Sequence, residues 1–290
     1  MSDSQQEHLP ELIQIKALPA MYDDSTHQLW HCDTVDGPMM LKVCQLDSVD
    51  KSDFWQGMKC LFDVDLPSSL KEMSQVYQKL SEYGCLAIPE HIASDSANPT
   101  AFILARLSPG VSVKLSSVDD DMVQLLARHI SGLHSNRQIT WGAFHQANND
   151  ARHWPTRLQQ TLQTLSEQHL KSIPSKLLDA AMQQSMNMSM DYFVPIMPDL
   201  RWDQFLHQQG QLSTLVDLDA FVYGPRELEL VLLEYLLDNQ QAAVFMEIYQ
   251  QTHEQPDLSQ LRLPYRLLLF LMNVLGEQDL DKWMSADQRW

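Results

Sequence analysis

Basic residues are scarce in this sequence. Lys and Arg together number 20 against 38 Asp and Glu, so the formal net charge is -18 at pH 7. A field of this sign repels phosphate backbones and anionic membrane surfaces. We therefore expect neither nucleic acid nor a membrane as a partner.

Cysteines and long apolar runs are scarce as well. No apolar stretch approaches the roughly 18 residues that a helix needs to span a bilayer, and the first residues lack the basic and apolar regions of a secretory signal. We expect a cytoplasmic protein, in which cysteines without C-x-x-C spacing act as small buried apolar residues rather than as a disulfide or zinc site. The four cysteines are Cys32, Cys44, Cys60 and Cys85.

The 290 residues, 44% of them hydrophobic, suffice for one large or two modest globular domains. Short apolar runs predict strands at 13–18, 27–32, 37–44, 86–94 and 100–107, with a helix at 68–84, and Asp36-Gly37 predicts the turn between the second and third strands. From about residue 119 the pattern is mainly helical, interrupted by a hairpin at 205–218. We expect an α+β fold divided into residues 1–110 and 111–290.

Several charged residues lie in segments that otherwise have the pattern of core. Side chains alternate along a strand, so Lys42 shares its face of the third strand with Met40 and Cys44. Asp199 and Asp217 each border an apolar run near the predicted hairpin. The pattern indicates a shared site.

The layout and three motifs resemble the kinase-like phosphotransferases, and most of all the aminoglycoside phosphotransferase and fructosamine kinase branch. Residues 197–200, Met-Pro-Asp-Leu, stand where that family has H-G-D-L, and residues 215–219, Leu-Val-Asp-Leu-Asp, stand where it has the acid that binds metal. Residues 223–230, Tyr-Gly-Pro-Arg-Glu-Leu-Glu-Leu, are similar to its G-h-R-E-x-D-L-A segment. The resemblance implies a two-lobed protein kinase-like fold with a strand-rich N-terminal lobe and a helical C-terminal lobe.

The resemblance also implies a nucleotide site and a catalytic site. Lys42 would contact the α- and β-phosphates of ATP and Glu72 would be its ion-pair partner. Asp199 would be the base or orienting group for the acceptor hydroxyl, and Arg201 would stabilise charge beside it. The implied activity is ATP- and Mg²⁺-dependent transfer of a phosphoryl group to a sugar-like or amino-containing small molecule, a reaction that needs positioning and charge neutralisation.

Carboxylates and amide oxygens are the expected ligands of the metal, because Mg²⁺ prefers oxygen donors. Asp217 would hold the Mg²⁺ that bridges the phosphates. Gln204 stands where the family has a metal-binding Asn, and Asp219 is a candidate second ligand or a turn acid.

Departures from the family motifs support an alternative, a degenerate, non-catalytic, pseudokinase-like binding or regulatory protein. Met197 replaces the His of the family motif, Gln204 replaces its Asn, and the expected nucleotide loop at 18–30 contains no glycine. Retention of charged residues at the three central positions favours an enzyme, because buried unpaired charges are costly unless they serve a function.

Each single residue also has an ordinary structural role open to it. Lys42 can be a surface lysine on an edge strand, Glu72 a solvated helix residue, and Asp199 and Asp217 turn or capping residues. His27 and His31 are four residues apart, but no third ligand is in view, so a structural role is favoured over a metal site.

Overall fold

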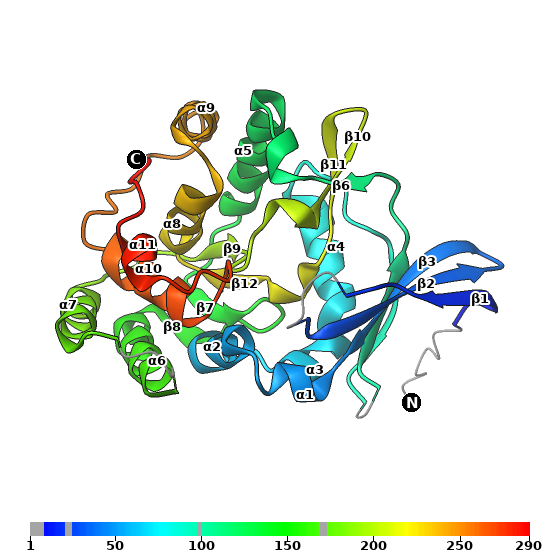
Figure 1. Ribbon diagram of the computed structural model, residues 1–290, viewed down its shortest axis with the longest axis horizontal. Helices are drawn as coiled ribbons and strands as arrows, with labels where there is room; N and C mark the ends of the chain where they lie inside the picture. Colours follow the sequence, from blue (N-terminus) through cyan, green and yellow to red (C-terminus); the bar gives the residue numbers. More distant parts are fainter. Residues whose placement is uncertain (1–8, 21–24, 98–99, 169–172) are drawn as a thin grey trace.

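The N-terminal part of the chain is an antiparallel sheet. The computed structural model describes residues 9–20, 25–97, 100–168 and 173–290. Five strands form the sheet in the order β1-β2-β3-β5-β4 (Figure 1). Their bounds are β1 Leu12–Ala17, β2 His27–Thr34, β3 Gly37–Cys44, β4 His91–Asp95 and β5 Phe102–Arg106. Gly37 adopts φ +105° at the β2–β3 turn, a conformation in which glycine meets no steric cost, and the predicted turn lies at this position.

Helix α4 (Met73–Tyr83) connects this sheet to the rest of the molecule. Its buried residues recur at helical spacing and its contacts reach β4, α5 and the segment 218–220. The helix begins at Met73 rather than at residue 68, because α3 (Leu66–Ser69) and a 3₁₀ turn (Leu70–Glu72) precede it.

Helices α1 (Leu46–Val49) and α2 (Asp53–Phe62) lie between β3 and α3. The sequence pattern predicts no helix in this stretch, so both were missed. The Ser52 hydroxyl caps α2 by accepting a hydrogen bond from the Trp55 amide. The Ser-Asp start followed by apolar residues at helical spacing was a signal that could have revealed this helix.

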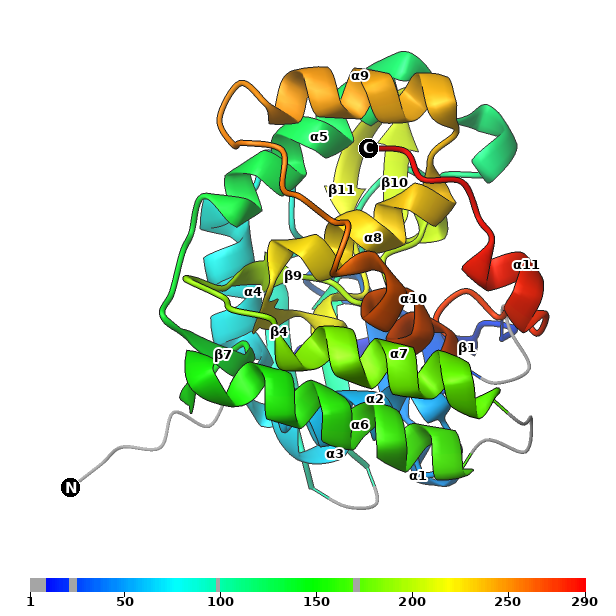
Figure 2. The ribbon, with the colours of Figure 1, turned by 90° about the vertical axis from the view of Figure 1, so that its left-hand side faces the viewer.

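The C-terminal part is mainly helical. Figure 2 shows α6 beside α7 along one side and α5 beside α9 at the other end. The helices are α5 Asp120–His134, α6 Trp154–Gln168, α7 Ser175–Met186, α8 Arg226–Leu236, α9 Asn239–Tyr249, α10 Arg262–Leu271 and α11 Leu280–Met284.

Two small sheets lie among these helices. One has the order β11-β10-β6 and contains the predicted hairpin; the other has the order β8-β7-β12-β9 and was not predicted. Their bounds are β6 Val111–Ser112, β7 Thr140–Ala143, β8 Asn149–Asp150, β9 Val194–Ile196, β10 Phe205–Gln208, β11 Gln211–Leu215 and β12 Val222–Gly224. The segment from β9 to β12 therefore runs from one small sheet through the other and back, and it carries the acids of interest.

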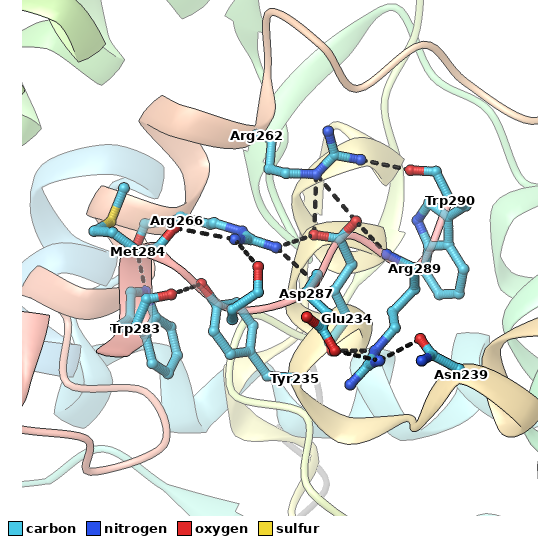
Figure 3. Close-up of polar contacts among 11 residues, drawn as sticks. Glu234, Tyr235, Asn239, Arg262, Arg266, Trp283, Met284, Asp287, Arg289 and Trp290 are labelled. Carbon is cyan, nitrogen blue, oxygen red and sulfur yellow. Dashed lines mark hydrogen bonds and ion pairs between the residues drawn. The ribbon is translucent and has the colours of Figure 1, made fainter. Parts of the chain in front are cut away.

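A buried glutamate holds the last turns of the chain. Glu234 of α8 is 1% exposed and accepts hydrogen bonds from Arg262 and Arg266 of α10 (Figure 3). Arg266 also donates to the carbonyls of residues 284, 286 and 287, and the Arg289 amide donates to Glu234. One carboxylate thus neutralises two arginines and fixes the segment after α11.

Across the part of the chain that the structure describes, no helix is long and apolar enough to cross a membrane.

Candidate active site

Asp217 occupies a special backbone position. It follows β11 and begins a 3₁₀ turn (Leu218–Ala220) with φ 67° and ψ 57°, the left-handed region that non-glycine residues rarely adopt. Such conformations cost free energy and cluster at functional sites. This turn directs the carboxylates of Asp217 and Asp219 towards a single cation.

Lys42 of β3 reaches both of these acids. Its ammonium group donates a hydrogen bond to Asp217 and another, at 2.6 Å, to Asp219, and its side chain is 15% exposed. Burial favours the neutral amine, but the two carboxylates outweigh it and raise the pKa of Lys42. Lys42 in turn overcomes the effect of burial on Asp217 and lowers the pKa of that carboxyl. Lys42 is therefore a buried, permanently charged group and not a surface lysine.

Asp199 lies in the field of the same cluster. Burial first, and then the negative charge of Asp217, raise the pKa of Asp199 to about 7, while Arg201 and Lys42 oppose the rise. Its Oδ1 is buried without a hydrogen-bond partner among the described residues. A buried carboxyl that is poised near neutrality, with an oxygen left unpaired, is suited to receive or donate a proton.

Arg201 lies near this carboxyl. Its Nε lies 3.2 Å from the Asp203 carboxylate. Its charge lowers the pKa values of both Asp199 and Asp217. Its role in stabilising charge during the reaction stays a prediction.

The predicted ion pair between Glu72 and Lys42 is wrong. Glu72 lies in the 3₁₀ turn before α4, and its carboxylate accepts a hydrogen bond from Gln75 on the next turn. The face of α4 nearest the lysine carries Tyr77. Burial raises the pKa of Tyr77, and the charge of Lys42 opposes this rise. Lys42 therefore takes its partners from the 217–219 turn.

Gln204 is held by hydrogen bonds to its neighbours. Its Oε1 accepts a hydrogen bond from the Arg201 amide at 2.8 Å, and its Nε2 donates to the Asp199 carbonyl at 3.2 Å and to the Asp199 carboxylate at 3.4 Å. The amide oxygen has a second lone pair, so the role of Gln204 as a metal ligand stays a prediction. The contacts from Nε2 orient Asp199.

The described residues do not form a complete metal site from protein side chains alone. Within the described ranges no three His, Cys, Asp or Glu side chains form a group that could hold a metal ion. Asp217 and Asp219 nevertheless converge on one cation, the ammonium of Lys42. Mg²⁺ in phosphotransferases needs only one or two carboxylates besides phosphate and water. The donor set therefore fits a metal that arrives with a nucleotide, held by Asp217 with or without Asp219.

His27 is a site residue whose position the sequence did not predict. It begins β2 and is 9% exposed, with Nε2 at 3.6 Å from the Asp219 carboxylate. Burial, and next the charge of Lys42, hold the pKa of His27 well below its usual value, so the ring is neutral. His31 lies instead beside Asp33, with Nδ1 at 3.8 Å from its carboxylate.

A second buried network supports the segment that carries Asp199. Glu229 of α8 is fully buried and accepts hydrogen bonds from the Met197 amide at 2.7 Å and from the His134 ring at 2.9 Å. The other nitrogen of His134 bonds to the Tyr249 hydroxyl at 2.8 Å. Met197 replaces the histidine of the family motif, and its backbone is nevertheless anchored two residues before Asp199.

We expect Glu229→Gln to lower the free energy of unfolding by about 1–3 kcal/mol, because one of the two carboxyl oxygens that accept buried hydrogen bonds becomes an NH2 group. Urea denaturation measures this loss. Glu247→Gln, at an exposed position of α9, is the matched control and should change stability by less than about 0.5 kcal/mol. Equal stability of the two variants would contradict the anchoring role of Glu229.

Comparison with known proteins gives matches of structure but not of sequence. No family model and no curated protein matches the sequence. Among solved structures, macrolide 2'-phosphotransferase MphH from Brachybacterium faecium aligns with a TM-score of 0.57 at 11% identity, over 95% of this chain and 92% of that one. The chain has the fold of the small-molecule phosphotransferases.

Two further structures support this fold. A Haemophilus somnus protein assigned as a fructosamine-3-kinase aligns with a TM-score of 0.61 at 12% identity, covering 95% of this chain and 89% of that one. A thermostable mutant of aminoglycoside phosphotransferase APH(4)-Ia, in a ternary complex with ADP and hygromycin B, aligns with a TM-score of 0.58 at 14% identity, covering 91% of this chain and 88% of that one. The prediction of a two-lobed, kinase-like α+β fold is confirmed; the division between residues 110 and 111 stays a prediction.

Proposed function

We propose that the protein is an ATP- and Mg²⁺-dependent phosphotransferase that acts on a hydroxyl group of a small molecule. The observation that carries this proposal is the convergence of Lys42, Asp217 and Asp199 from three separated segments into one charged cluster. A phosphoryl-transfer site needs a cation for the phosphates, a carboxylate for the metal and a group for the acceptor proton. The cluster contains one residue of each kind.

The cluster also suggests how the reaction would proceed. Lys42, permanently charged, would move its hydrogen bonds from the acids to the phosphates of ATP. When bound, Mg²⁺ would neutralise phosphate oxygens, and Asp217 is the carboxylate to hold it. Asp199 would accept the proton of the acceptor hydroxyl as that oxygen bonds to the γ-phosphorus and the bond from phosphorus to the leaving ADP oxygen breaks. A pKa of about 7 suits this proton transfer at neutral pH.

The acceptor class is a finer part of the same proposal. The solved neighbours include a macrolide 2'-phosphotransferase and an enzyme bound to hygromycin B. The chain carries a net charge of -18, which favours a cationic acceptor over an anionic one. We therefore propose a sugar-like or amino-containing acceptor, in the cytoplasm.

The test is transfer of labelled γ-phosphate from ATP to a panel of amino sugars, fructosamines and macrolides. A phosphorylated product that depends on Asp199 would support the proposal. A second candidate function is that of a nucleotide-binding protein without catalysis. It is favoured by the Oε1 of Gln204, which already accepts a hydrogen bond from the Arg201 amide. Nucleotide binding without transfer to any acceptor would favour that second function.

Arg201 gives a prediction about pH. Its charge opposes the rise in the pKa of Asp199, so Arg201→Ala should raise this pKa further. If ionised Asp199 is the base, the acidic limb of the profile of kcat/KM against pH should move upward by about one unit. If Arg201→Ala is less active than the wild type but the acidic limb of its pH profile has not moved, this electrostatic role would be contradicted.

A further inference from the structure

The outermost strand of the N-terminal sheet is unusually exposed. Every residue of β1 is exposed, including Ile13 at 69%, Leu12 at 52% and Ile15 at 44%. Val35, in the turn after β2, is also exposed, at 59%. Exposed apolar side chains gathered at one sheet edge mark an interaction surface more often than a solvated one.

The backbone of β1 is open on one side. The strand pairs with β2 and with no other strand in the described part of the chain (Figure 1). Leu18 donates to Leu29 and Glu11 accepts from Val35, which fixes the groups that face β2. The register shift between Leu12 and Gln14 leaves the backbone groups of Leu12 and Ile15 directed away from β2. These groups are ready to pair with another strand.

The two faces of β1 differ in chemistry. Leu12 lies opposite Thr34 and Ile15 opposite Cys32, so both share the face of the small apolar cluster formed by Cys32, Met39, Ala93 and Leu104. Glu11 and Lys16 lie on the other face, since Lys16 is opposite His31 and Glu11 bonds to the residue after Thr34.

We propose that β1 pairs in antiparallel fashion with β1 of a second copy of this chain, so that the two sheets become continuous. One register gives suitable partners to the side chains on both faces of β1. It places Leu12 opposite Ile15 of the partner subunit on the apolar face and Glu11 opposite Lys16 of the partner subunit on the polar face.

The twofold axis repeats each of these pairs, giving two ion pairs and two aliphatic pairs. The self-complementary charge of Glu11 and Lys16 is the reason to assign a second copy rather than an unrelated partner. Pairing between two copies uses the β1 edge of each, and the twofold axis makes the dimer closed.

The dimer should be weak and dependent on salt. A single strand pair buries little area, so we expect a dissociation constant on the order of 1–100 µM. Each copy has a net charge of -18. Moderate salt screens this long-range repulsion and also the two exposed ion pairs, while it leaves the apolar contact. Because exposed ion pairs are weak, the loss of repulsion dominates, and association should strengthen on going from low to physiological ionic strength.

Sedimentation equilibrium of the full chain tests the proposal and its register. The wild type should pass from 33.4 kDa towards twice this mass as concentration rises. Glu11→Lys and Lys16→Glu each bring like charges together and should weaken association by tenfold or more, whereas the double variant should restore it.

Both side chains are exposed, so these changes should leave the melting temperature of each variant unchanged. Lys51→Glu, an exposed lysine elsewhere, is the control and should dimerise as the wild type does. The proposal would be overturned if the wild type remains monomeric, or if neither charge reversal weakens its dimerisation.

Discussion

Asp199→Asn is expected to abolish most phosphoryl transfer and, at the same time, to make the protein more stable above neutral pH. Loss of a positioned base lowers turnover by about 10²- to 10⁴-fold. The gain in stability arises because the wild type keeps a buried carboxylate beside Asp217, whereas asparagine has the same shape without the charge. Opposite changes in activity and stability are expected of a residue retained for chemistry.

The sign of the pH dependence follows from the raised pKa. The Asp199 carboxyl titrates near 4 in the unfolded chain and at about 7 in the folded protein. Between these values the folded state holds a proton that the unfolded state has released, so stability falls as pH rises from about 4 to about 7. Above pH 7 the full penalty remains, at most about 4 kcal/mol for a three-unit shift.

Urea unfolding at pH 5 and pH 8 measures this effect. The difference in unfolding free energy between Asp199→Asn and the wild type should be larger at pH 8 than at pH 5. Asp191→Asn, the same change at an exposed position, should show no such difference. An Asp199→Asn protein that is less stable than the wild type at pH 8 would mean that Asp199 is a structural residue.

Glu234→Ala is expected to cause the largest loss of stability. The substitution leaves Arg262 and Arg266, which are 9% and 3% exposed, without a countercharge. Removing one partner of a buried ion pair costs about 3–5 kcal/mol. The segment after α11 should also loosen, because Arg266 holds its carbonyls (Figure 3).

The exposed ion pair between Glu277 and Lys282 provides the control. Glu277→Ala should lower the stability much less than Glu234→Ala does, because solvent screens the pair. Urea denaturation compares the two variants, and amide hydrogen exchange reports the loosening of residues 285–290. Similar unfolding free energies for both variants would contradict the account of Glu234 as the anchor of the C-terminal segment.

Much of the fold followed from periodicity and turn chemistry. Helix α5 begins beside Asp119, whose side chain caps it by accepting from the Met122 amide, and Asp36-Gly37 identified the β2–β3 turn. The strands β7, β9 and β12 are only three or four residues long. A run of that length is too short for alternation to distinguish a strand from a loop, so the sheet they form was missed.

For the site, residue types were predictable and their partners were not. Lys42, Asp217 and Asp219 meet in space, and their roles with a nucleotide stay proposals. The Glu72 prediction was wrong because Lys42 takes its partners from the 217–219 turn. That pairing joins segments far apart in the chain, which spacing along the sequence does not specify. Gln204 as a metal ligand stays a prediction.

The most direct test of the central claim is the affinity for ATP with Mg²⁺, measured by isothermal titration calorimetry on the wild type and on Asp217→Asn. Asparagine tolerates the left-handed backbone at this position and removes only the charge. We predict that the wild type binds the nucleotide and that Asp217→Asn binds at least about tenfold more weakly, a loss of about 1.4 kcal/mol.

Glu72→Gln, which alters a residue that does not touch Lys42, should bind as the wild type does. No binding by the wild type at millimolar nucleotide, or equal binding by Asp217→Asn, would contradict a nucleotide site at this cluster.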